Sequence, residues 1–174
     1  MTDVEFPDPF PAPFDCPPAR VREEWIDYNG HMNMAFYNLA FDQALDVVYD
    51  VLGIGRGYLA ASGCSLFTLE AHVTYVRELA SDDPLRITWQ LLDFDGKRLH
   101  FFETMHHGEE GWLAATSEQI AIHVDMNARR AAPFPDTLLE RFGRVRTSHA
   151  RLPKPPQAGH VIAIPRRADP GSAS

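Results

Sequence analysis

The sequence lacks the features that mark several large classes of protein. It has two cysteines in 174 residues, which is too few for a disulfide framework, and no Cys-x-x-Cys pair that suits zinc. No apolar run approaches the roughly 20 residues that a membrane helix needs. The acidic, proline-rich start differs from the basic start of a signal peptide. We therefore expect a cytoplasmic protein that neither crosses nor binds a membrane.

Several catalytic signatures are also missing. There is no Gly-x-Ser-x-Gly elbow, no Gly-x-x-x-x-Gly-Lys-Ser/Thr phosphate loop and no His-Glu-x-x-His zinc motif. The eight histidines are scattered, and those on expected strands are typical of packing or solvent-facing positions. The sequence thus predicts neither a metal site nor an organic cofactor.

Charge is unevenly spread along the chain, whose formal net charge is −8. Residues 1–140 hold 9 basic and 23 acidic side chains, a net of −14, whereas residues 141–174 hold 7 basic side chains and one acidic, a net of +6. An acidic body disfavours nucleic acid as a partner, because binding to a phosphate backbone depends on positive charge. A local basic patch can still bind an anionic small molecule.

The length fits one domain of ordinary size. Prolines crowd both ends, so we expect a proline-rich arm over 1–18, a folded domain over 19–150 and a basic tail over 151–174. The arm lies either on the surface of its own domain or on a partner subunit, and the sequence leaves this open.

Between the ends, one helical pattern precedes a series of strands. Apolar residues recur at helical spacing from Ala35 to Leu52, with Asn33 as a plausible N-cap and Gly53 as a stop. The region over 20–26 favours an extended run, and 136–143 favours a short closing helix. Alternating residues then predict strands, with Phe67, Leu69, Ala71, Val73 and Tyr75 expected on one face of the first, and with further strands over 85–91, 99–105 and 112–124.

This order predicts an α+β fold. An antiparallel sheet of about five strands is expected to wrap around one long central helix. Such a sheet keeps exposed edges and a second face, and pairing with another copy of the chain would cover them.

The most informative segment runs from Trp25 to Asn33, with the sequence WIDYNGHMN. It brings a carboxylate, an imidazole and an amide together just before a helix N-terminus, whose free N–H groups can stabilise an oxyanion. A nearby carboxylate can serve as general base or as nucleophile. The same residue types are also those that an ordinary turn and N-cap use.

The run VREEWIDYNGHMNMAFYNLAFDQALD resembles the entry segment of hotdog-fold acyl-CoA thioesterases, which share an Asp-x-x-Gly-His-x-Asn turn leading into the central helix. The runs GCSLFTLEAHVTYVREL, DGKRLHFFETMHH and GWLAATSEQIAIHVD resemble a narrower group. That group comprises betainyl-CoA thioesterases and the thioesterase domains fused to some carnitine dehydrogenases. The resemblance covers residues 19–135.

The resemblance implies an acyl-CoA thioesterase that acts as a homodimer or homotetramer, with its site between subunits and no cofactor. It implies Asp27 as the catalytic carboxylate, with His31 and Gly30 at the thioester carbonyl together with the helix start at Met34, and Asn33 bracing the turn. Some relatives use an acid further into the helix, where Asp42 lies. Whether Asp27 activates water or attacks the thioester stays open.

A betainyl group carries a quaternary ammonium, which favours aromatic faces with an acid nearby. We expect Trp25, Tyr28, Tyr37 and Glu70 to contact the substrate, with Tyr75 and Trp89 as further aromatic candidates. Arg77, Lys97 and Arg98 are candidates for the coenzyme A phosphates. The alternatives are a thioesterase for another short or aromatic acyl-CoA, or a non-catalytic scaffold that binds acyl groups or a protein.

Overall fold

The computed structural model describes residues 6–164 and confirms an antiparallel sheet that wraps around a long helix. Four long strands form the sheet, in the order β4-β5-β6-β3, with short strands added at both sides. The helices are α1 (Met34–Leu52), α2 (Arg56–Ser62), α3 (Asp136–His149) and the 3-10 turn Glu23–Trp25. The strands are β1 (Phe14–Asp15), β2 (Ala19–Arg20), β3 (Cys64–Tyr75), β4 (Pro84–Phe94), β5 (Arg98–His107), β6 (Leu113–Asp125) and β7 (Arg130–Ala131).

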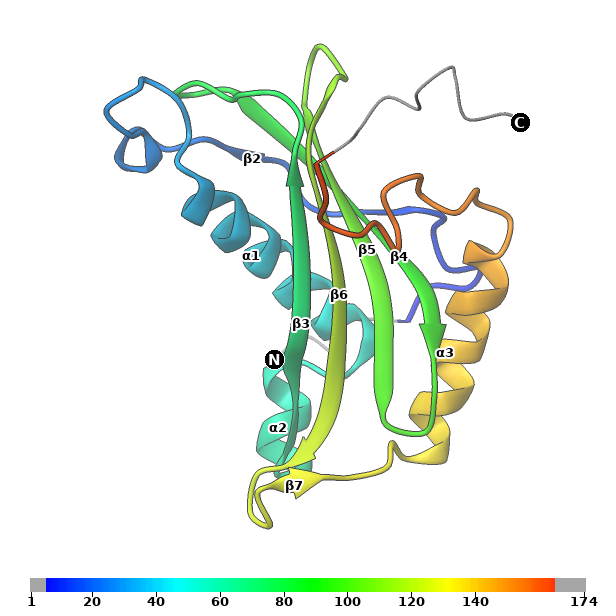
Figure 1. The fold of residues 1–174 in the computed structure, drawn as a ribbon. Helices are drawn as coiled ribbons and strands as arrows, with labels where there is room; N and C mark the ends of the chain where they lie inside the picture. Colours follow the sequence, from blue (N-terminus) through cyan, green and yellow to red (C-terminus); the bar gives the residue numbers. More distant parts are fainter. Residues whose placement is uncertain (1–5, 165–174) are drawn as a thin grey trace, which may run out of the picture.

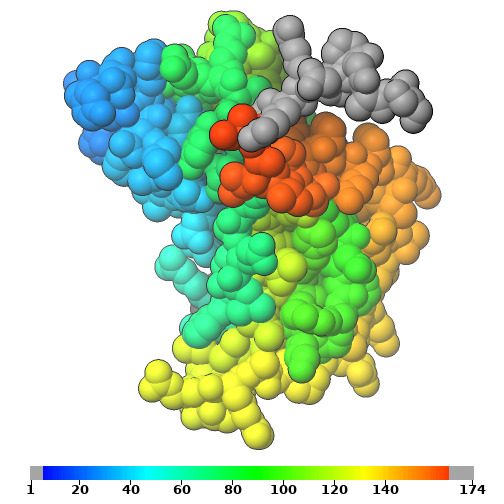
Figure 2. Space-filling model, viewed as in Figure 1, coloured from blue at the N-terminus to red at the C-terminus, as the bar shows by residue number. Residues whose placement is uncertain are grey.

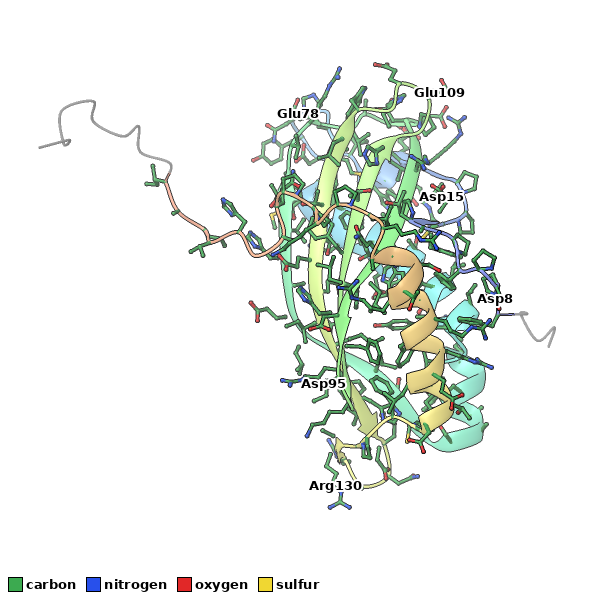
Figure 3. All side chains as sticks on the ribbon, turned by 90° about the vertical axis from the view of Figure 1, so that its right-hand side faces the viewer. Asp8, Asp15, Glu78, Asp95, Glu109 and Arg130 are labelled. Carbon is green, nitrogen blue, oxygen red and sulfur yellow. The ribbon has the colours of Figure 1, made fainter. Side chains whose placement is uncertain are left out.

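The molecule has two layers, and the two faces of the sheet are covered differently. Helices α1 and α3 lie on the same face: in Figure 1 α1 runs behind the sheet and α3 stands to the right of β4, and Figure 3 shows both helices on one side of the sheet. The segment 151–164 crosses the opposite face, which we call the outer face, and Figure 2 shows it on the surface there. None of the helices among residues 6–164 is long and apolar enough to cross a membrane.

Helix α1 forms where the sequence predicts it. The side chain of Asn33 accepts a 3.0 Å hydrogen bond from the Ala35 N–H, which caps the first turn, and Gly53 ends the helix with a left-handed φ of 77°. The buried side of the helix is apolar and packs into the main core, with Phe41, Val48 and Leu52 at most 1 % exposed. Helical periodicity was a reliable guide here because one side of α1 faces the sheet along its whole length.

Strand β3 differs from its expected pattern. Its pairing with β6 shifts register between Thr68 and Glu70, so Leu69 is an extra residue. The expectation that Phe67 shares a face with Val73 is therefore wrong. Phe67 lies on the outer face and is 48 % exposed, whereas Val73 packs against the core under α1. A one-residue insertion moves every side chain before it to the other face.

Two other expectations need correction, and one helix was not expected. In the run over 20–26, strand β2 ends at Arg20 and Glu23–Trp25 forms a 3-10 turn. The closing helix α3 extends to His149, because Val145 and His149 continue its buried side through a polar, basic sequence. Helix α2 was not predicted, since its seven residues are too few to show a periodic pattern.

The described part of the arm lies on its own domain. Phe10 is 3 % exposed and packs its ring edge-on against Trp89 and His149. The imidazole of His149 accepts from the Leu91 N–H at Nδ1 and donates from Nε2 to the Pro11 carbonyl, both at 2.8 Å. Burial lowers the pKa of His149, which favours this neutral form. Trp89, a candidate for the substrate site, belongs instead to this core.

Candidate active site

The predicted catalytic residues lie in a tight turn at the start of α1. Ile26 and Met32 form an isolated antiparallel bridge, and the Asp27 N–H donates to the His31 carbonyl at 3.0 Å. The Gly30 N–H donates back to the Asp27 carbonyl at 3.0 Å, and its φ of +85° is one that glycine adopts without strain. The loop therefore closes on itself immediately before the helix.

Hydrogen bonds within the turn fix the Asp27 carboxylate. Its Oδ1 accepts a 2.8 Å hydrogen bond from the Asn29 N–H, and the side chain is half-buried. At the helix start, Asn33 accepts from the N–H groups of Ala35 and Phe36. Among the bonds within residues 6–164, the Met34 N–H donates to no acceptor. The Asp27 carboxylate thus lies in the turn that leads into α1, seven residues before Met34 in the sequence, and the free N–H at the helix start can stabilise an oxyanion.

A cavity of about 320 Å³ lies beside this helix start, lined by Met32, Met34, Tyr37, Tyr75, Val76, Arg77 and Glu78. The Tyr75 hydroxyl donates to the Met34 carbonyl at 3.3 Å, and the Tyr37 hydroxyl accepts from the Leu79 N–H at 3.3 Å. The two phenol rings meet edge to face with centroids 5.3 Å apart. The end of β3 and the start of α1 therefore form one aromatic-walled site.

The His31 imidazole contacts a carboxylate from another segment of the chain. Its Nε2 lies 3.2 Å from Oε2 of Glu78, on the segment that follows β3. Glu78 was not predicted as a site residue, because nothing in the sequence shows that the end of β3 returns to this turn. Only the pairing of β3 in the sheet brings the two residues together.

Of the four predicted substrate-binding residues, one lines this cavity and three lie elsewhere. Tyr37 lines the cavity. Trp25 is 3 % exposed and stacks on Phe36 inside the domain, while Tyr28 is 97 % exposed at the tip of the turn. Glu70 lies on the outer face, where it lines a separate cavity of about 270 Å³ with residues that include His72 and Glu118. The structure brings neither Tyr28 nor Glu70 to the cavity at α1.

Another carboxyl group lies in the core. Glu103 occupies a core-facing position of β5 and is 0 % exposed, and burial raises its pKa well above the usual value. The sequence did carry a signal for it, because Glu103 occupies one of the alternate positions of the strand that are otherwise apolar, namely Leu99, Phe101 and Met105. A charged residue type at an apolar position of a strand pattern marks a buried polar group.

With this geometry established, comparison with known proteins identifies the family. A family model for the thioesterase-like superfamily matches residues 21–142. The chain belongs to that superfamily. The match includes the turn, α1 and the whole of β3–β6, and it stops within α3.

Curated relatives extend the match. A betainyl-CoA thioesterase of Pseudomonas aeruginosa is 39 % identical over 145 residues, which is 83 % of this chain and 91 % of that protein. An L-carnitine dehydrogenase/betainyl-CoA thioesterase of Rhizobium meliloti is 34 % identical over 148 residues. That alignment spans 85 % of this chain but 30 % of the longer protein, so the chain corresponds to one part of it.

Solved structures agree with this grouping. A hypothetical protein of Staphylococcus aureus, solved in complex with CoA, has a TM-score of 0.82 at 33 % identity and covers 88 % of this chain and 96 % of its own. A candidate thioesterase of Pseudomonas putida KT2440 has a TM-score of 0.77 at 34 % identity, covering 90 % and 99 %. The hotdog fold expected from the sequence is thereby confirmed, and the protein is a thioester hydrolase.

Proposed function

We propose that this protein hydrolyses betainyl-CoA to betaine and free coenzyme A. The observation that carries the proposal is the half-buried Asp27 carboxylate in a turn directly before the open N-terminus of α1. The choice of acyl group is supported by the 39 % identity to a betainyl-CoA thioesterase along nearly its full length. The cytoplasm, where acyl-CoA thioesters are available, is the location that this function predicts.

The proposed chemistry needs little beyond this turn. The thioester carbonyl lies at the start of α1, where the Met34 N–H and the positive end of the helix dipole stabilise the oxyanion. Asp27 then acts in one of two ways. In the first, it removes a proton from a water that attacks the carbonyl carbon, and the C–S bond breaks to release the coenzyme A thiolate. In the second, it attacks the carbonyl carbon itself, expels the coenzyme A thiolate and forms a mixed anhydride, which water then cleaves to the free acid.

The acyl group is proposed to bind against Tyr37 and Tyr75. Their rings form a wall of the cavity, and the Glu78 carboxylate lies on its rim. Aromatic faces with a nearby carboxylate suit a quaternary ammonium, which cannot donate a hydrogen bond. Trp25 does not line the cavity; it stacks on Phe36, and its carbonyl accepts from the Asn33 N–H at 2.9 Å, so it holds the turn at the start of α1.

We further propose that two copies of the chain complete the site. Strand β3 is a 12-residue edge of the sheet, and an unpaired edge of that length invites another strand. Exposed apolar side chains follow this edge and the neighbouring side of α1, namely Met34, Leu39, Phe67, Leu69, Tyr75 and Val76. A second subunit at this edge would lie next to the cavity at α1. Its exposed Tyr28 or its Glu70 would then contact the substrate.

Free-thiol release over a panel of acyl-CoA esters tests the proposal. The panel pairs betainyl-CoA with its uncharged isostere, 3,3-dimethylbutanoyl-CoA, in which carbon replaces the quaternary nitrogen. Acetyl-CoA and an aromatic acyl-CoA complete it. We expect the highest kcat/KM for betainyl-CoA. A higher kcat/KM for the isostere or the aromatic ester would mean that the protein acts on another acyl group. No thiol release from any ester would contradict the proposed thioesterase activity.

A further inference from the structure

The backbone carries Arg77 past the end of β3 toward the start of β6. The N–H groups of Val76 and Arg77 both donate to the Ala114 carbonyl, at 2.8 and 3.1 Å. These bonds fix the chain where it leaves the cavity beside Met34. The Arg77 side chain extends from there toward Trp112, which immediately precedes β6.

The guanidinium of Arg77 lies over the Trp112 ring, with its Cζ 4.1 Å from the ring centroid. The indole is itself held from two sides. Its centroid lies 5.0 Å from that of the buried His107 ring, and its Nε1–H donates to Glu110 at 3.0 Å. Trp112 is therefore a fixed platform, and a cation–π contact orients the plane of the guanidinium above it.

The carboxylates near Arg77 contact other side chains, so no ion pair neutralises the charge of Arg77. Glu78 lies against His31, and Glu110 accepts from the indole of Trp112. Within residues 6–164, no carboxylate oxygen lies within 4 Å of an Arg77 nitrogen. An oriented arginine with free donors is suited to a phosphate, which it binds with two parallel hydrogen bonds.

The other candidate cations are poorly placed for the same ligand. Lys97 and Arg98 follow Asp95 in the turn between β4 and β5, and Arg98 donates from Nε to the Asp95 carboxylate at 2.8 Å. Figure 3 shows Asp95 and Glu78 at opposite ends of the sheet. Since Glu78 neighbours both Arg77 and the cavity, only the end of the sheet that carries Arg77 adjoins the α1 N-terminus.

We propose that Arg77, held over the Trp112 ring, binds a phosphate group of the coenzyme A moiety. This inference rests on the proposed function, because it takes the thioester to lie at Met34. The pantetheine arm then runs from the cavity past Val76 to the rim at Trp112. The stack orients the guanidinium before the substrate arrives, which lowers the entropy cost of binding.

The test compares two thioesters of one acyl group, betainyl-CoA and betainyl-N-acetylcysteamine, which lacks every phosphate. Replacement of Arg77 by glutamine (Arg77→Gln) should raise KM for the CoA ester about ten- to a hundredfold and leave kcat near the wild-type value. The kcat/KM for the N-acetylcysteamine ester should not change. Arg77→Lys, which keeps the charge but not the planar fork, should restore part of the loss.

Arg130→Gln is the matched control, since Arg130 is an exposed arginine at the opposite end of the sheet in Figure 3. It should leave both esters unaffected. Calorimetric titration with free CoA separates this inference from the proposed function, because binding needs no hydrolysis. Weaker CoA binding by Arg77→Gln would support the role of Arg77 even if no ester were hydrolysed. An unchanged affinity, an equal loss for both esters, or a wild-type protein that does not bind CoA would overturn it.

Discussion

The side-chain amide of Gln119 donates a 2.9 Å hydrogen bond to Oε2 of Glu103, inside the core that lies between the sheet and α1. Gln119 also donates to the Ser117 hydroxyl at 3.0 Å, and Thr68 on the edge strand lies 3.4 Å from its Oε1. These side chains form a polar line from the edge of the sheet to its centre. Glu103 is 0 % exposed at the end of this line, where burial keeps it protonated at pH values at which a free glutamate is ionised.

Glu103→Gln should therefore stabilise the protein increasingly as the pH rises. In wild type the folded pKa is raised, so the stability from this group is complete below the unfolded value of 4.5 and declines as the pH climbs toward the folded pKa. Glutamine is nearly isosteric, has no proton to lose and can still accept from Gln119. The measurement is Tm for both proteins from pH 4 upward, and a difference that stays constant with pH would contradict the assignment.

Phe10→Ala should be strongly destabilising, although the residue lies in a proline-rich segment near the N-terminus. The ring is 3 % exposed between Trp89 and His149, and loss of a buried phenylalanine side chain costs about 3–5 kcal/mol. Tyr28→Ala is the control, because that aromatic ring is 97 % exposed and its loss should change stability little. Urea unfolding measures both, and equal midpoints for the two variants would mean that the arm does not pack on the domain.

Leu69→Lys should separate the proposed subunits. Leu69 is the extra residue of the bulge on the edge strand and is 59 % exposed in one subunit, so a charge there would be buried at the interface. Sedimentation should show a shift toward monomer, with loss of turnover and an unchanged circular dichroism spectrum. Val161→Lys places the same charge at an apolar residue that is 77 % exposed on the segment crossing the outer face, and it should change neither property. An unaltered assembly in Leu69→Lys would argue against an interface along β3.

Local sequence patterns predicted the parts of the fold that depend on nearby residues. Helix α1, its Asn33 cap and its Gly53 stop follow from helical spacing and end signals, and β4–β6 follow from alternation. The bulge at Leu69 was not predictable, because alternation looks the same whether or not the partner strand skips a residue. The length of α3 was missed because its last turn is buried through contacts with β4 and the arm, which are distant in the sequence.

The candidate site likewise has local parts that the sequence predicts and parts that only the fold brings together. The turn that holds Asp27, Gly30 and Asn33 is local, so its motif was visible in the sequence. The pairing of His31 with Glu78 and the position of Arg77 over Trp112 depend on the order of strands in the sheet. The sequence named Arg77 as one of three cations for coenzyme A, but only the fold separates it from Lys97 and Arg98.

If the Asp27 carboxylate performs the hydrolysis, betainyl-CoA turnover should depend on it, and turnover by Asp27→Asn beside Asp42→Asn measures that dependence. Asparagine can still accept from the Asn29 N–H, so the turn should keep its shape and Tm should stay near the wild-type value. We predict that Asp27→Asn lowers kcat at least about 100-fold, whereas Asp42→Asn, on an exposed side of α1, keeps most of the activity. Near-normal turnover by Asp27→Asn, or loss of turnover only in Asp42→Asn, would show that Asp27 is not the catalytic carboxylate.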